Sequence, residues 1–174
     1  MSIKNKKLLL CAVFAAISAA LSPMSIPIGA VPVNMVHISV LVSAGLLGAK
    51  YAGLSQLVFV LIGVAGLPIF SGFSSGLGAI LGPTGGFIIG YIFCAFIVGW
   101  LIKFTKKSWL GMFGCMYLGW AVTYIFGVSW FMAVTGSQFL PALQVCLLPF
   151  IIPDFAKTVV AVFIVKRLRP VVNK

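Results

Sequence analysis

Residues 149–157 read PFIIPDFAK and lead into an apolar run from Thr158 to Val165. Asp154 is the only acidic residue in the chain, and it lies in a segment hydrophobic enough to cross a bilayer. Lys157 follows three positions later, so the two side chains share one face of a helix. Because a charge at membrane depth is costly unless it is paired or lines a functional cavity, the pair predicts a polar pocket in a helical membrane protein.

The composition is that of an integral membrane protein. The 174 residues are 62% hydrophobic and 7% charged, whereas an average soluble domain has roughly 25% charged residues. At roughly 20 residues per helical span, six spans take up most of the chain. We therefore expect an all-α protein with a single transmembrane domain over residues 1–174.

Clusters of Gly, Pro and Lys divide the sequence into six expected spans. These are residues 8–24, 33–47, 51–67, 84–102, 109–134 and 140–165. The first begins after a basic start, as a signal peptide would, but we expect it to be kept as a span. Pro149 and Pro153 would disturb the hydrogen bonds of the last one.

The basic residues predict the orientation. If the amino terminus is cytoplasmic, the inner segments are about 1–7, 48–51, 103–108 and 166–174, and they contain every basic residue except Lys157. Cytoplasmic loops carry such an excess of Lys and Arg, so both termini are predicted in the cytoplasm. The net charge of +11 is then explained by topology and by contacts with anionic lipids. We expect no nucleic-acid partner, because that function needs a basic face on a soluble scaffold.

One short motif keeps an enzyme open as an alternative. Residues 72–76 read GFSSG and match the pattern of a serine nucleophile, which normally lies at a turn between a strand and a helix. Here the motif lies in a loop between apolar runs. A triad around Ser74 would have to recruit His37 and Asp154, the only histidine and the only acid. We expect no catalytic residues.

The sequence also lacks the motifs of an autonomous pump or a metalloprotein. It contains no phosphate-binding loop of the ATPase type, so energy for any transport would come from another protein. The four cysteines, Cys11, Cys94, Cys115 and Cys146, lie in separate apolar runs without metal or redox spacing. We expect neither a metal nor a cofactor.

A membrane-embedded binding subunit accounts for more of the sequence. Asp154 and Lys157 are expected to bind a ligand, because an apolar pair would fix helix packing without desolvating two charges. An uncharged loop at 68–83 leads into the helix start at 84–86 and resembles an adaptable lid. The neutral candidates, each of which could instead be a packing residue, are Asn34, Thr84, Gly85, Gly86 and Tyr91.

Small residues recur every four positions in the first span. One ridge consists of Ala12, Ala16 and Ala20, and a second of Ala15 and Ala19. Such a ridge lets another helix approach closely. The spacing fits packing within the protein and docking of a partner equally well.

The sequence resembles the BioY family, the biotin-binding S components of energy-coupling factor (ECF) transporters. The resemblance covers nearly the whole chain, and its most specific stretches are residues 66–91, from GLPIF to GPTGGFIIGY, and PDFAK at 153–157. Family members often have a TLQ-like stretch where this chain has Met35, Val36 and His37, which leaves His37 without an assigned role.

The resemblance implies a six-helix S-component fold in the cell membrane of a bacterium. It implies capture of biotin from outside, as cargo and not as a cofactor, and uptake with a transmembrane coupling subunit and two ATPases. The alanine ridges would dock on the coupling subunit. Asp154 would accept the ureido N–H groups and Lys157 would donate to a ligand oxygen, at an end of the ligand that is left open. A different vitamin is an alternative substrate.

Overall fold

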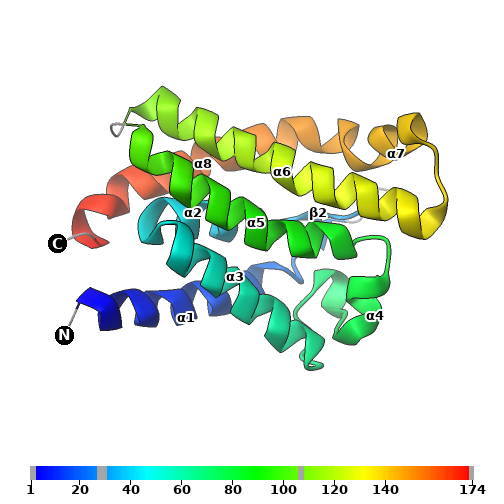
Figure 1. The fold of residues 1–174 in the computed structure, drawn as a ribbon, viewed down its shortest axis with the longest axis horizontal. Coiled ribbons are helices and arrows are strands. Elements are labelled where there is room, and N and C mark those ends of the chain that lie inside the picture. The colour runs from blue at the N-terminus through cyan, green and yellow to red at the C-terminus, as the bar shows by residue number, and fades with distance from the viewer. Residues whose placement is uncertain (1–2, 27–30, 106–107, 173–174) are drawn as a thin grey trace.

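The computed structural model describes residues 3–26, 31–105 and 108–172. Its helices run along the long axis of the molecule, and both ends of the chain lie at the same end of it (Figure 1). The strands β1 (Ser25–Ile26) and β2 (Val33–Asn34) form a small antiparallel ladder. The helices are α1 (Ile3–Leu21), α2 (Val36–Leu47), α3 (Ala49–Val64), α4 (Gly76–Leu81), α5 (Gly85–Leu101), α6 (Trp109–Thr135), α7 (Phe139–Cys146) and α8 (Ile151–Val172), with short 3₁₀ turns η1 (Ser71–Phe73), η2 (Ile102–Phe104) and η3 (Leu148–Phe150).

Three helical segments of the described residues are long and apolar enough to cross a membrane. They are Gly85–Phe104, Trp109–Thr135 and Phe139–Val172, while α2 and α3 are shorter apolar helices. The predicted helical membrane architecture is confirmed at this level, and the count of six spans stays a prediction.

The last expected span, 140–165, is divided in the structure. Helix α7 ends at Cys146, the turn η3 contains Pro149, and α8 then runs from Ile151 to Val172. Pro153 lies in the first turn of α8, where its missing N–H removes no helical hydrogen bond. Pro149 and Pro153 therefore mark the end of one helical segment and the start of the next. The basic residues after Val165 continue α8.

Helix α2 lies at the centre of the molecule. It contacts α1, α3, α5 and α8, and nearly all of its side chains are buried. A helix that is apolar on every side is expected in such a position. Gly48 alone separates α2 from α3, with φ 76° and ψ 175°, a conformation that is essentially restricted to glycine.

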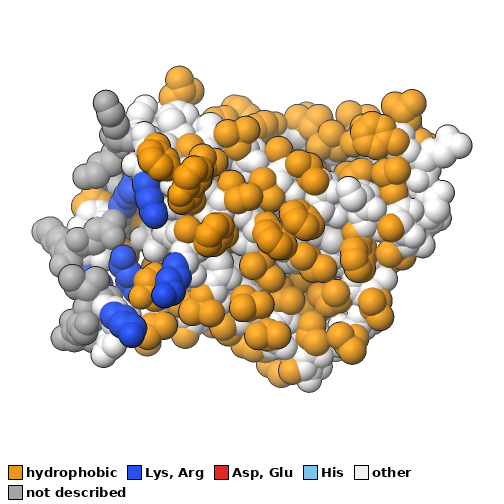
Figure 2. Space-filling model, viewed as in Figure 1, with side chains coloured by type: hydrophobic (Ala, Val, Ile, Leu, Met, Phe, Trp, Pro, Cys, Tyr) orange, Lys and Arg blue, Asp and Glu red, His pale blue; other side chains and the backbone are white. Residues whose placement is uncertain are grey.

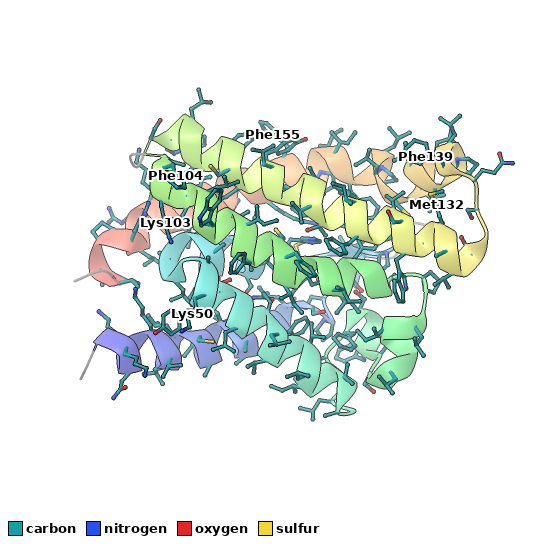
Figure 3. All side chains as sticks on the ribbon, viewed as in Figure 1. Lys50, Lys103, Phe104, Met132, Phe139 and Phe155 are labelled. Atoms are coloured by element: carbon teal, nitrogen blue, oxygen red, sulfur yellow. The ribbon has the colours of Figure 1, made fainter. Side chains whose placement is uncertain are left out.

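The basic side chains gather at the end of the molecule that holds the termini (Figure 2). Lys50 and Lys103 lie at this end, whereas Met132 and Phe139 lie at the opposite one (Figure 3). Apolar side chains cover most of the remaining visible face (Figure 2). This distribution agrees with the predicted orientation, which stays a prediction. Three other basic residues of the expected inner segments, Lys106, Lys107 and Lys174, lie outside the described residues.

Candidate ligand-binding site

A pocket opens among the helices. Residues of α2, α5, α6 and α8 line it, together with the loops that carry Ser71 and Thr84. Ser74 lines the pocket from a loop and is exposed, whereas most of the lining residues that lie on helices are buried. The lining consists of Ser22, Val31, Pro32, Asn34, His37, Phe70, Ser71, Ser74, Thr84, Phe87, Ile88, Tyr91, Trp120, Thr123, Tyr124, Phe150 and Lys157.

The charged pair borders this pocket from α8. The Nζ of Lys157 donates to Oδ1 of Asp154 at 3.2 Å, and both residues are buried, 6% and 2% exposed. The hydroxyl of Tyr124 donates to Oδ2 of the same carboxylate. Lys157 and Tyr124 line the pocket, while Asp154 lies behind them and faces a second cavity between α6 and α8. The carboxylate therefore holds two lining residues in place.

Aromatic rings form one wall beside Lys157. The Lys157 Nζ lies 5.6 Å from the centroid of the Trp120 ring, within the range of a cation–π contact. The indole N–H of Trp120 donates to Oγ1 of Thr158 at 2.9 Å, which fixes the ring. His37 lies against this wall, with centroid distances of 4.0 Å to Trp120 and 4.6 Å to Tyr91. This end of the pocket thus combines flat apolar surfaces with a few polar atoms.

Asn34 lies on the lining, but its amide already joins three segments. Its Nδ2 donates to the carbonyl of Ser22 at 3.0 Å and to Oγ of Ser71 at 2.6 Å. Its Oδ1 accepts the backbone N–H of Val36 at 2.7 Å. Asn34 therefore positions the first loop and η1 at the pocket, and a direct contact with a ligand stays a prediction.

The four other neutral or glycine candidates separate into two pairs. Thr84 and Tyr91 line the pocket from the start and second turn of α5. Gly85 and Gly86 instead allow close packing: a Cβ at Gly86 would come within 2.3 Å of Cβ of Trp130, and one at Gly85 within 1.6 Å of the Ile80 carbonyl oxygen. These two glycines let α5 begin tightly against α6 and α4, so they shape the pocket from behind.

The two alanine ridges of α1 face different directions. Ala15 is buried and Ala19 is half-buried, whereas Ala12, Ala16 and Ala20 are exposed. The structure therefore leaves the ridge of Ala12, Ala16 and Ala20 open to an outside helix and uses the other ridge for internal packing.

The serine motif at 72–76 spans the turn η1 and the first residue of α4. The hydroxyl of Ser74 donates to the carbonyl of Ser71 at 2.8 Å. This hydrogen bond stabilises a surface turn, so the hydroxyl is committed to the loop and not to His37 or Asp154.

Several lining residues received no binding role from the sequence. Trp120 and Tyr124 are one helical turn apart on α6, and the intervening Thr123 shares their face, so the spacing signals a common surface. Phe70 and Phe87 come from either side of α4 and carry no such signal, because only the folded loop brings them together. His37 is a polar residue in an apolar run, but its sequence context indicates no partner for it.

Comparisons with known proteins place the chain in a family. The family model described as "BioY family" matches residues 1–174. A probable biotin transporter BioY of Pyrococcus horikoshii is 36% identical over 166 residues, covering 95% of this chain and 98% of that protein. The biotin transporter BioY of Thermotoga maritima is 34% identical over 164 residues, covering 94% and 96%.

A solved structure agrees with this placement. The crystal structure of an S-component for biotin from an ECF-type ABC transporter superimposes with a TM-score of 0.90 at 31% sequence identity, covering 98% of this chain and 95% of that one. The predicted resemblance is thereby confirmed. The chain belongs to the BioY family.

Proposed function

We propose that this protein is the biotin-binding S component of an ATP-driven ECF vitamin importer. The observation that carries the proposal is the buried Asp154–Lys157 pair, of which Lys157 lines a pocket between the helices, in a chain whose relatives are named biotin transporters. Such names describe transport, so the protein is a binding and transport subunit and not an enzyme.

The pocket suits the chemistry of biotin. The fused rings and the aliphatic tail of biotin need apolar walls, which Phe70, Phe87 and Trp120 provide. The ureido ring needs hydrogen-bond donors and acceptors. Lys157 has three N–H donors, and its contact with Asp154 leaves others for a ligand oxygen. Asp154 accepts ureido N–H groups if the ligand displaces Tyr124, and otherwise acts by holding Lys157.

The arrangement in the membrane follows from the same features. We propose six spans, counting α7 and α8 together, with both termini in the cytoplasm of a multi-pass protein of the cell membrane. The basic end then faces inward, and the loops that carry Ser71, Ser74 and Thr84 face outward with the pocket. Biotin would be captured from outside.

Delivery would require partners. We propose that the exposed ridge of Ala12, Ala16 and Ala20 packs against a helix of the transmembrane coupling subunit, which two ATPases drive. Small side chains allow backbones to approach closely in lipid, where helix association depends on packing. The neighbouring exposed side chains Val13 and Ile17 would flank that contact.

Binding by the purified chain tests the proposal. We expect isothermal titration calorimetry in detergent to show one biotin per chain and no heat with thiamine or riboflavin. Mass spectrometry of the denatured protein should identify biotin as the co-purifying molecule. Saturable binding of another vitamin, with none of biotin, would support the alternative substrate and refute this one.

A further inference from the structure

His37 is a buried polar side chain whose own fold gives it no hydrogen bond. It is the second residue of α2, is 8% exposed and lines the pocket. Neither Nδ1 nor Nε2 has a hydrogen-bond partner within the described part of the chain. The backbone carbonyl of Asn34 approaches the ring without the geometry of a hydrogen bond.

An unpaired imidazole at this depth needs a partner from the cavity. Most buried polar side-chain atoms in proteins are hydrogen-bonded, because leaving one unpaired in apolar surroundings is costly. The rings of Trp120 and Tyr91 hold the imidazole from two sides, so it is held firmly at the lining. Because His37 lines the pocket, a molecule bound there can supply its partner.

We propose that His37 is a specificity-determining residue that hydrogen-bonds the polar ring head of the ligand, which for biotin is the ureido group. This inference rests on the proposed function. A neutral imidazole has one donor and one acceptor nitrogen. A ureido group carries both N–H donors and a carbonyl acceptor, so it satisfies either tautomer of His37, whereas a carboxylate offers only acceptors.

The charges around His37 also favour the ureido end of the ligand. Lys157 and Asp154 neutralise each other at 3.2 Å, and the other ionisable residues on the pocket lining are Tyr91 and Tyr124. A ligand carboxylate placed here would bring an uncompensated negative charge among apolar walls, which a neutral ureido head avoids. The flat walls of Trp120 and Tyr91 also fit a compact ring system better than a flexible tail.

Two biotin analogues test the contact. In 2-iminobiotin the ureido oxygen is replaced, and in biotinamide the tail carboxylate is capped. Dissociation constants would be measured for both and for biotin with the native protein, His37→Leu, His37→Asn and Ser55→Ala. Ser55 is the matched control, because its hydroxyl is also buried and unpaired in the described structure but lies on α3 away from the pocket lining.

We expect His37→Leu to weaken biotin binding by about 10- to 100-fold, the usual effect of leaving a buried ligand group unpaired. The preference for biotin over 2-iminobiotin should fall towards one, and the preference over biotinamide should stay unchanged. His37→Asn, which keeps a donor and an acceptor, should restore part of the affinity. Ser55→Ala should bind all three compounds like the native protein.

The outcomes separate this inference from the proposed function. A native protein that does not bind biotin overturns both. If the native protein binds biotin, and the folded His37→Leu and His37→Asn proteins bind it with the same affinity, the role of His37 alone is overturned. It is also overturned if only the preference for biotin over biotinamide falls. If His37→Leu fails to purify as a monodisperse protein, His37→Phe decides, because it keeps an aromatic ring and has no hydrogen-bonding nitrogen: the native preference over 2-iminobiotin in that variant refutes the contact.

Discussion

Two buried polar clusters of this molecule look alike in composition but differ in what they contact. In the first, the hydroxyls of Ser18 and Ser39 lie 2.9 Å apart, and the amide of Gln56 donates to Ser18 at 3.2 Å. In the second, Asp154 binds Lys157 and Tyr124 beside the pocket. The first cluster joins α1, α2 and α3 and its polar groups satisfy one another, whereas the second leaves donors facing a cavity.

This difference shows how to distinguish packing from binding among polar groups in a membrane protein. Hydrogen bonds between membrane helices stabilise packing whether the groups are charged or neutral. A binding group is expected to have unused hydrogen-bonding capacity and to border empty space. Lys157 and His37 meet both conditions. Gln56 is fully buried, does not line the pocket, and has both amide atoms hydrogen-bonded to Ser18.

Removing the charge of the second cluster should have the largest effect on binding. We expect Asp154→Asn to weaken biotin binding by about 30-fold or more, because truncating one partner of a buried charge pair at a binding site costs about 2 kcal/mol or more. Calorimetry would measure the affinity, and thermal unfolding in detergent would show whether the protein remains folded.

The double variant Asp154→Asn, Lys157→Met controls for stability. It removes the unpaired ammonium, so we expect its unfolding temperature to recover while its biotin affinity stays low. Unchanged affinity in Asp154→Asn, or restored affinity in the double variant, would reduce the pair to a packing element like the first cluster.

The two alanine ridges lie on α1, the helix that carries Ser18 of the first cluster, and we expect them to differ in function. We expect Ala16→Leu, on the exposed ridge, to lower biotin uptake by at least about tenfold in cells that contain the coupling subunit and ATPases, with biotin binding unaffected, because a larger side chain prevents close helix approach. Ala15→Leu, on the buried ridge, should instead destabilise the protein by about 1–3 kcal/mol through overpacking. Normal uptake by folded Ala16→Leu protein would contradict the docking assignment.

The smallest effect is expected from the first cluster itself. Gln56→Met keeps the length of the side chain and removes its hydrogen bond to Ser18, so it should cost about 0.6 kcal/mol, the average for such bonds between membrane helices. Biotin affinity should equal that of the native protein. If the free energy of biotin binding fell by more than the free energy of unfolding, this cluster would also influence the pocket.

The sequence was sufficient where a single property marks a residue. Lone charges in an apolar segment singled out Asp154 and Lys157, which the structure pairs beside the pocket and whose binding roles stay predictions. The proline spacing signalled a disturbance that the structure resolves as the break between α7 and α8. The sequence was not sufficient where chemistry depends on neighbours. Gly85 and Gly86 serve close helix packing, and His37 shows its unpaired nitrogens only once α5 and α6 surround it.

The chain connections at the two ends of the molecule differ in length and in how tightly they are packed. Gly48 alone connects α2 to α3. A Cβ on the facing Gly99 would come within 2.5 Å of the Ala49 nitrogen, so the two backbones are in close contact there. The connections at the other end are longer and carry the turns η1 and η3. Local unfolding is cheapest where few backbone groups are packed. We therefore expect a ligand to enter by opening of the loops at that end, while the tightly packed α2–α3 junction stays closed.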